Sequence, residues 1–161
     1  MNVKKALCAL VVAFAMCGSV PLAKGQSISM TIESLGGASS GTGTSEASTS
    51  LGAVSKFDVA PSGFALSRTA TDWTLSSSVG VRVDSSLGSP SYSLTAQLGA
   101  APSSGVTWKV DGMSLSDASP TTLTNTGAYG SIGSYEWDIV IDDSAAGAVI
   151  DNSIVFTAVS N

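Results

Sequence analysis

Carboxylates are the side chains of this sequence with the most potential for chemistry. The chain of 161 residues contains 12 acidic residues, 7 Lys plus Arg and no His, which excludes imidazole bases, Ser-His-Asp nucleophiles and His metal ligands. Cys8 and Cys17 lie in a segment that we expect to be removed, so thiolate and disulfide chemistry is excluded as well. No S-x-x-K motif ends at Lys56 or Lys109, and no G-x-x-x-x-G-K-[ST] phosphate loop occurs.

A group of four acids occupies the end of one predicted strand. Glu136 and Asp138 point to the same strand face, and Asp142 and Asp143 follow directly after the strand. Glycosidases need two acids about 5–10 Å apart, but outward acids are equally typical of a solvated strand that discourages edge-to-edge pairing. A small sandwich also leaves little room for a deep cleft. We predict that the protein is not an enzyme, with a carboxylate-dependent glycosidase as the least favoured alternative.

Calcium is the metal that these acids could bind. Asp142, Asp143 and Asp138 offer hard oxygen ligands near a loop, and extracellular modules bind calcium at millimolar affinity. The sequence contains no EF-hand pattern. We expect no cofactor other than this candidate calcium ion.

Residues 1–25 have the pattern of a secretory signal peptide. Lys4 and Lys5 precede an uncharged apolar run from Ala6 to Met16, and Ala23-Lys24-Gly25 offers small residues before a cleavage point. The apolar run is too short to span a bilayer, which needs about 20 residues. We therefore expect a secreted protein of the periplasm, cell surface or extracellular space, with no membrane insertion after cleavage.

Cleavage would leave a strongly acidic chain. Four cations would remain beside all twelve acids, which gives a net charge of −8. Repulsion from phosphate argues against nucleic acid as a partner and against adhesion to an anionic membrane.

The mature sequence predicts an all-β fold. Ser and Thr make up 43 of the 136 residues from Gln26 onward, and apolar residues recur with period two instead of at helical spacing. The clearest runs are residues 28–33, 73–76, 79–83, 92–98, 106–110 and 135–141. Residues 153–159 hold consecutive apolar side chains, which predicts a strand covered on both faces. Asp111-Gly112 is a tight-hairpin signal, and short strands without intervening helices indicate an antiparallel β-sandwich.

The mature chain divides into three parts. Residues 26–35 form an N-terminal strand, the Gly/Ser/Thr-rich residues 36–50 form a flexible linker or loop, and residues 51–161 form the sandwich. Ile28, Met30 and Ile32 alternate with polar residues, so this strand must dock on a sheet. It can pair within its own domain, or it can donate to another copy of the chain and build a linear polymer.

Several of these segments together resemble a family of secreted surface domains. The order Arg68…Trp73-Thr74-Leu75, Val106-Thr107-Trp108, Tyr135 to Ile139 and Ile154 to Thr157 is similar to bacterial immunoglobulin-like domains of the WxL-like, spore-coat-U or fimbrial-subunit type. The resemblance covers residues 51–161 and implies an immunoglobulin-like sandwich of about 7–9 strands. The mature chain lacks the cysteine pair common in the spore-coat-U and fimbrial families.

These observations predict a secreted, non-enzymatic structural or adhesive component of the cell surface, the extracellular matrix or a fibre. Its expected partners are proteins, including copies of itself. The alternative is a carbohydrate-binding or adhesin module that recognises a cell-surface glycan. That alternative needs an exposed aromatic side chain on one sheet face, and Trp73, Trp108 and Trp137 are the candidates.

Overall fold

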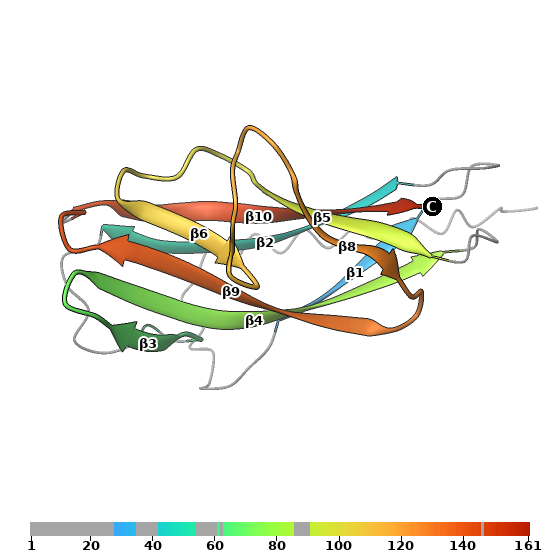
Figure 1. Cartoon of the computed structure of the whole chain (residues 1–161), viewed down its shortest axis with the longest axis horizontal. Helices are drawn as coiled ribbons and strands as arrows, with labels where there is room; N and C mark the ends of the chain where they lie inside the picture. The colour runs from blue at the N-terminus through green and yellow to red at the C-terminus, as the bar shows by residue number, and fades with distance from the viewer. Residues whose placement is uncertain (1–27, 35–41, 54–60, 62, 86–90, 146) are drawn as a thin grey trace, which may run out of the picture.

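The computed structural model describes residues 28–34, 42–53, 61, 63–85, 91–145 and 147–161. Two sheets lie face to face as the layers of a β-sandwich (Figure 1). Sheet A contains β1 (Ile28–Ser34), β3 (Ala65–Arg68), β4 (Asp72–Ser85), β6 (Val106–Val110), β7 (Met113–Ser114) and β9 (Ile132–Asp142). Sheet B contains β2 (Thr42–Ala53), β5 (Tyr92–Leu98), β8 (Thr121–Gly127) and β10 (Val149–Ser160). The strand orders are β1-β4-β9-β6-β7, with β3 also beside β4, and β2-β10-β5-β8.

The predicted all-β sandwich is confirmed. The described part of the chain contains no helix, and therefore none with the length and apolar character to cross a membrane. The strands pair antiparallel except β1, which runs parallel to β4. The immunoglobulin-like assignment stays a prediction.

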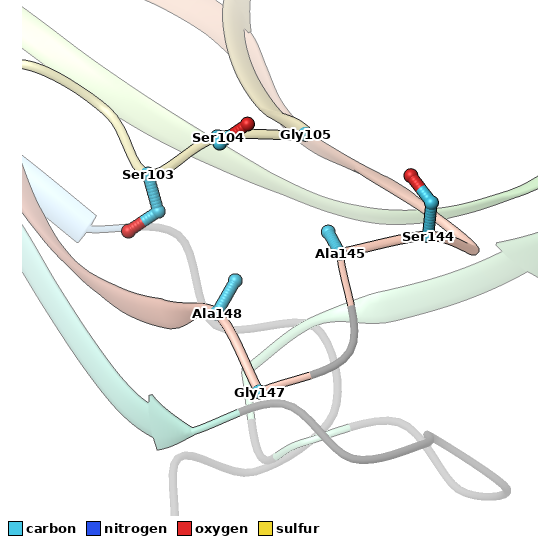
Figure 2. A pocket seen from close by; sticks show the side chains of 7 residues that line it. All are labelled: Ser103, Ser104, Gly105, Ser144, Ala145, Gly147 and Ala148. Atoms are coloured by element: carbon cyan, nitrogen blue, oxygen red, sulfur yellow. The ribbon is translucent and has the colours of Figure 1, made fainter.

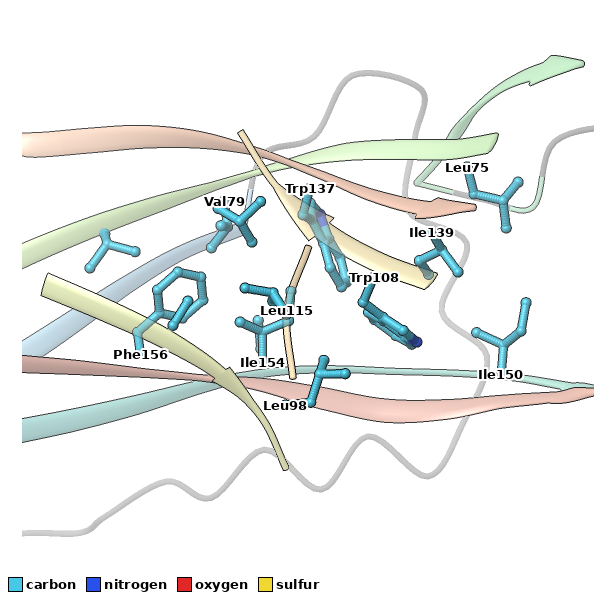
Figure 3. Packing of buried hydrophobic residues seen from close by; sticks show 14 of the residues in the cluster. Leu75, Val79, Leu98, Trp108, Leu115, Trp137, Ile139, Ile150, Ile154 and Phe156 are labelled. Carbon is cyan, nitrogen blue, oxygen red and sulfur yellow. The ribbon is translucent and has the colours of Figure 1, made fainter. Parts of the chain in front are cut away.

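The core forms where alternate apolar residues face the opposite sheet. β5 shows this most clearly, because Tyr92, Leu94, Ala96 and Leu98 are all buried while the residues between them are half-exposed. Trp108 of β6 and Trp137 of β9 lie side by side between the sheets with ring centroids 5.9 Å apart (Figure 3). Burial of these large side chains supplies the main driving force for packing the two sheets together.

The expected linker at residues 36–50 is wrong over residues 42–50, which belong to β2. Eleven register pairs join β2 to β10, from Val159 opposite Thr42 to Val149 opposite Ala53. Along this part of β2 the more buried positions are Gly43, Ser45, Ala47 and Thr49. The strand therefore alternates small inward residues with polar outward ones, a pattern that hydrophobicity alone does not reveal. The sandwich consequently begins before Leu51, and residues 36–41 lie outside the described residues.

β10 corrects a second expectation. Ile154, Phe156 and Ala158 are buried against sheet A, whereas Val155 is half-exposed and Val159 is 39% exposed. No described part of the chain therefore covers the outer face of β10. The prediction that residues 153–159 are covered on both faces is wrong.

β1 pairs within its own chain. Its register runs from Ile28 opposite Val79 to Ser34 opposite Ser85. β3 pairs with an earlier part of the same edge of β4, from Trp73 to Ser76. β1 also lies near β2 of the other sheet. Only residues 35–41 connect β1 to β2, which span at most about 25 Å when fully extended. This connector is about half as long as the predicted one.

The hairpin predicted at Asp111-Gly112 is confirmed. Val110 pairs with Met113, and the two turn residues have φ values of 48° and 75°, as a type I′ turn requires. The Asp111 carboxylate also accepts the N–H of Glu136 at 2.8 Å. This hydrogen bond joins the turn to the neighbouring strand β9.

Candidate functional site

Glu136 and Asp138 share the outer face of β9 in sheet A. Glu136 is exposed, whereas Asp138 is half-buried and accepts a hydrogen bond from Ser76 Oγ at 2.5 Å. Lys109 of β6 is the register partner of Asp138 on its other side. Both acids therefore lie on an open strand face, and Asp138 has a hydrogen-bond partner within the sheet.

Asp142 and Asp143 lie at the end of β9, where separate neighbours engage them. Hydrogen bonds from the side chain and the backbone N–H of Ser144 lower the pKa of Asp142. Asp143 forms a 3.8 Å ion pair with Arg68 Nη2. The guanidinium of Arg68 also lies 5.2 Å from the centre of the Trp73 ring. These contacts join the end of β9 to β3 and β4.

The calcium candidates Asp138, Asp142 and Asp143 are not brought together. Asp138 precedes Asp142 by four residues on an extended strand, which separates their Cα atoms by about 13 Å. Across the described ranges, no three His, Cys, Asp or Glu side chains gather as a group able to hold a metal ion. The geometry gives the calcium hypothesis no support.

Two of the hollows that the described residues line are shallow, and neither contains the acids of β9. The first, of about 340 Å³, lies between the loop before β6 and the loop between β9 and β10 (Figure 2). Small residues line it, and Ser103 at its rim donates a hydrogen bond to the carbonyl of Val149 at 2.8 Å. The second, of about 490 Å³, lies on sheet B and includes Glu46 and Asp151.

The three tryptophans belong to the core. Trp73 is 4% exposed, and Trp108 and Trp137 are each 1% exposed. A sugar-stacking platform needs an aromatic face in contact with solvent. The tryptophan platform proposed for the carbohydrate-binding alternative is therefore not present.

The outer face of sheet B carries a row of threonines that the sequence does not reveal. Thr157 of β10 is the register partner of Thr44 on β2 and of Thr95 on β5, and Thr95 is in turn opposite Thr122 on β8. Thr44 and Thr122 are exposed, and the two central threonines are half-exposed. The row crosses all four strands of the sheet.

Tyrosines near one end of the sandwich make the free energy of unfolding depend on pH. Burial raises the pKa of Tyr92, with a smaller contribution from Tyr129, and burial with contributions from Tyr92 and Asp111 raises the pKa of Tyr135. The Tyr92 and Tyr129 ring centroids are 5.2 Å apart.

We predict that the free energy of unfolding falls as the pH rises above about 10, because the unfolded chain ionises its tyrosines before the folded chain does. This contribution is fully present below that pH and is lost as the pH passes through the raised pKa values. Urea midpoints at about pH 8 and about pH 11 measure the loss. The double variant Tyr92→Phe, Tyr135→Phe should show a smaller change between the same two pH values, and an equal change would contradict the assignment.

Comparison with known proteins does not place the chain in a family. No family model matches it, and no curated protein or solved structure shows significant similarity to it.

Proposed function

We propose that this chain is a secreted, non-enzymatic structural or adhesive module of the cell surface, the extracellular matrix or a fibre. The observation that carries the proposal is the outer face of sheet B, which is four strands wide and contains Glu46 and Asp151 as the only charged residues of its strands. A broad face rich in hydroxyl groups suits extended contact with another surface. The acids of β9, in contrast, lie on an open strand face or at its end.

Immunogold labelling with antibodies against the mature chain tests the proposal. We expect label on the cell surface or in the extracellular matrix of the source cells, and no release of sugar from a glycan library. Label confined to the cytoplasm would contradict secretion. Glycan turnover that is lost in the Glu136→Gln, Asp138→Asn double variant would support the glycosidase alternative instead.

Strand donation is our proposal for how copies associate. The seven register pairs that β1 makes with β4 can form between two copies as well as within one. The connector of residues 35–41 must then bridge from one copy to the other, so donation requires that the two domains lie close together. Ile28, Met30 and Ile32 remain the candidate polymerisation residues.

A disulfide between register partners distinguishes the two pairings. Met30 and Val81 are opposite each other, and adjacent strands lie about 4.8 Å apart, within the range that a disulfide can bridge. In a mature chain carrying Met30→Cys and Val81→Cys, we expect refolding at high concentration to yield oligomers linked between chains. Non-reducing gels measure this outcome. Crosslinks within single chains at every concentration would exclude strand donation.

A further inference from the structure

Charge is distributed unequally between the two outer faces. The described cations Arg68, Arg82 and Lys109 all lie on strands of sheet A, together with most of the acids found in strands. The strands of sheet B contain no cation, and their acids Glu46 and Asp151 both lie on the same side of the threonine row, around the larger hollow. In an acidic protein, the rest of this face is where a like-charged copy meets the least repulsion.

The part of this face that we consider is centred on the threonine row Thr44–Thr157–Thr95–Thr122. On one side of it, Val159 is the register partner of Thr42 and Ser93. On the other side, Val155 is the register partner of Glu46 and Gln97. Apart from Glu46, Ser93 and Gln97, the residues named in these rows are Thr or Val, whose β-branched side chains have stiff χ1 angles and lose little freedom on contact.

We propose that the outer face of sheet B binds the same face of a second copy, with a two-fold axis along the threonine row. This inference rests on the proposed structural function and names the surface through which it acts. The axis places the threonine row of each copy opposite that of the other copy, and it places Val155 opposite Val159 of the second copy. Threonine hydroxyls both donate and accept hydrogen bonds, so two facing rows can satisfy one another. Twisted sheets pack face to face at about −30°, which the two copies can adopt.

This arrangement keeps the carboxylates apart. The axis sets Glu46 opposite Thr42 of the second copy, and it carries Asp151 beyond the end of the other sheet. No acid of the face then meets an acid across the contact. The face is self-complementary in charge, as a two-fold interface between identical subunits requires.

The size of the face predicts a weak dimer. With the axis on the threonine row, only that row and the row on each side of it face the second copy. Four strands about 4.8 Å apart and three side-chain rows about 6.8 Å apart cover about 390 Å² per copy. Two such faces bury about 780 Å², which is below the roughly 1,000 Å² of a stable specific interface and fits only a weak, transient contact. Because general repulsion between two acidic copies opposes association, salt should strengthen the dimer by screening that repulsion.

Sedimentation velocity of the mature chain tests the proposal. We expect the mean mass to rise toward that of a dimer between about 10 μM and about 1 mM, and to rise further when salt is added. Thr157→Lys places two cations opposite each other on the axis and should weaken dimerisation by about tenfold or more. Thr122→Lys, at an exposed position of the same row, should also weaken dimerisation. Because Thr122 is exposed, this variant keeps the proposal testable if Thr157→Lys fails to fold.

The matched control is Thr107→Lys, on an exposed position of β6 in sheet A. It adds the same charge outside the contact, where it only reduces the general repulsion between acidic copies, so dimerisation should be unchanged or slightly stronger. A mature chain that stays monomeric at about 1 mM would overturn the proposal. Equal effects of Thr107→Lys and Thr157→Lys would overturn it too, because only the net charge would then matter.

The disulfide variant separates this contact from strand donation. Once Met30→Cys and Val81→Cys are linked within one chain, strand exchange is blocked but the outer face of sheet B is unchanged. Dimerisation of the locked monomer that Thr157→Lys weakens supports the face contact even if strand donation fails. A locked monomer that no longer associates would assign the dimer to β1 and reject the face contact.

Discussion

Replacing Trp137 by alanine is expected to lower the free energy of unfolding by about 3–5 kcal/mol. The side chain is 1% exposed, and its ring centroid lies 5.6 Å from that of Phe64 and 5.9 Å from that of Trp108. Alanine would leave a cavity between the two sheets that these rings cannot fill without leaving their own contacts. A domain of ordinary stability has about 5–15 kcal/mol in total, so we expect a much lower denaturant midpoint.

Trp137→Phe is the matched control. The indole N–H of Trp137 is buried and has no hydrogen-bond acceptor among the described residues. Phenylalanine removes that polar group while keeping most of the ring volume, so the loss should be much smaller than for alanine. Urea unfolding followed by far-ultraviolet circular dichroism measures both variants. Equal losses for the two would show that volume between the sheets is not what Trp137 contributes.

Asn152→Ala is expected to lower the free energy of unfolding by about 1–3 kcal/mol, because it removes three hydrogen bonds made by a buried side chain. Asn152 is 9% exposed on β10, and its Nδ2 donates to the carbonyl of Ala100 at 2.8 Å. Its Oδ1 accepts the N–H groups of Ala100 at 3.1 Å and Ser153 at 2.9 Å. One amide therefore attaches the loop after β5 to β10, beside a hydrogen bond from the Gly99 N–H to the Ser153 carbonyl.

Gln97→Ala provides the comparison for Asn152. Gln97 Nε2 donates to the carbonyl of Asp117 at 2.7 Å from a half-exposed position on β5. Water can replace that hydrogen bond, so we expect the free energy of unfolding to fall by less than about 0.5 kcal/mol. Chemical denaturation of both variants at neutral pH gives the two values. A loss for Asn152→Ala as small as that for Gln97→Ala would mean that water reaches the loop after β5.

The strands that could be predicted from sequence are those in which apolar and polar residues alternate. Tyr92 to Leu98 is the clearest example, because the burial of each residue follows directly from its polarity. β2 could not be predicted in this way, since its inward positions are Gly43, Ser45, Ala47 and Thr49. Burial there depends on small size beside β10, and a Gly/Ser/Thr tract has the same composition whether it pairs or not.

The candidate sites show the same limit. The sequence suggests a common site for Glu136, Asp138, Asp142 and Asp143 because they are close together along the chain, but an extended strand spreads such residues apart. The threonine row shows the reverse, because its residues are far apart along the chain and close together in the fold. Its members come from four strands and meet only through the register of sheet B, and no local pattern reports a register between distant strands.

The strand order of sheet B has a consequence for the timing of folding. β10 lies between β2 and β5 and follows every other strand along the chain. A ribosome or an export channel that delivers this chain from its N-terminus therefore releases β2 about a hundred residues before its pairing partner. Contacts of such long sequence separation close slowly, on a scale of milliseconds to seconds for β-sandwiches. β5 and β8 can pair before then, but β2 has no neighbour in sheet B until β10 emerges, so sheet B is completed only after every strand of sheet A has been delivered.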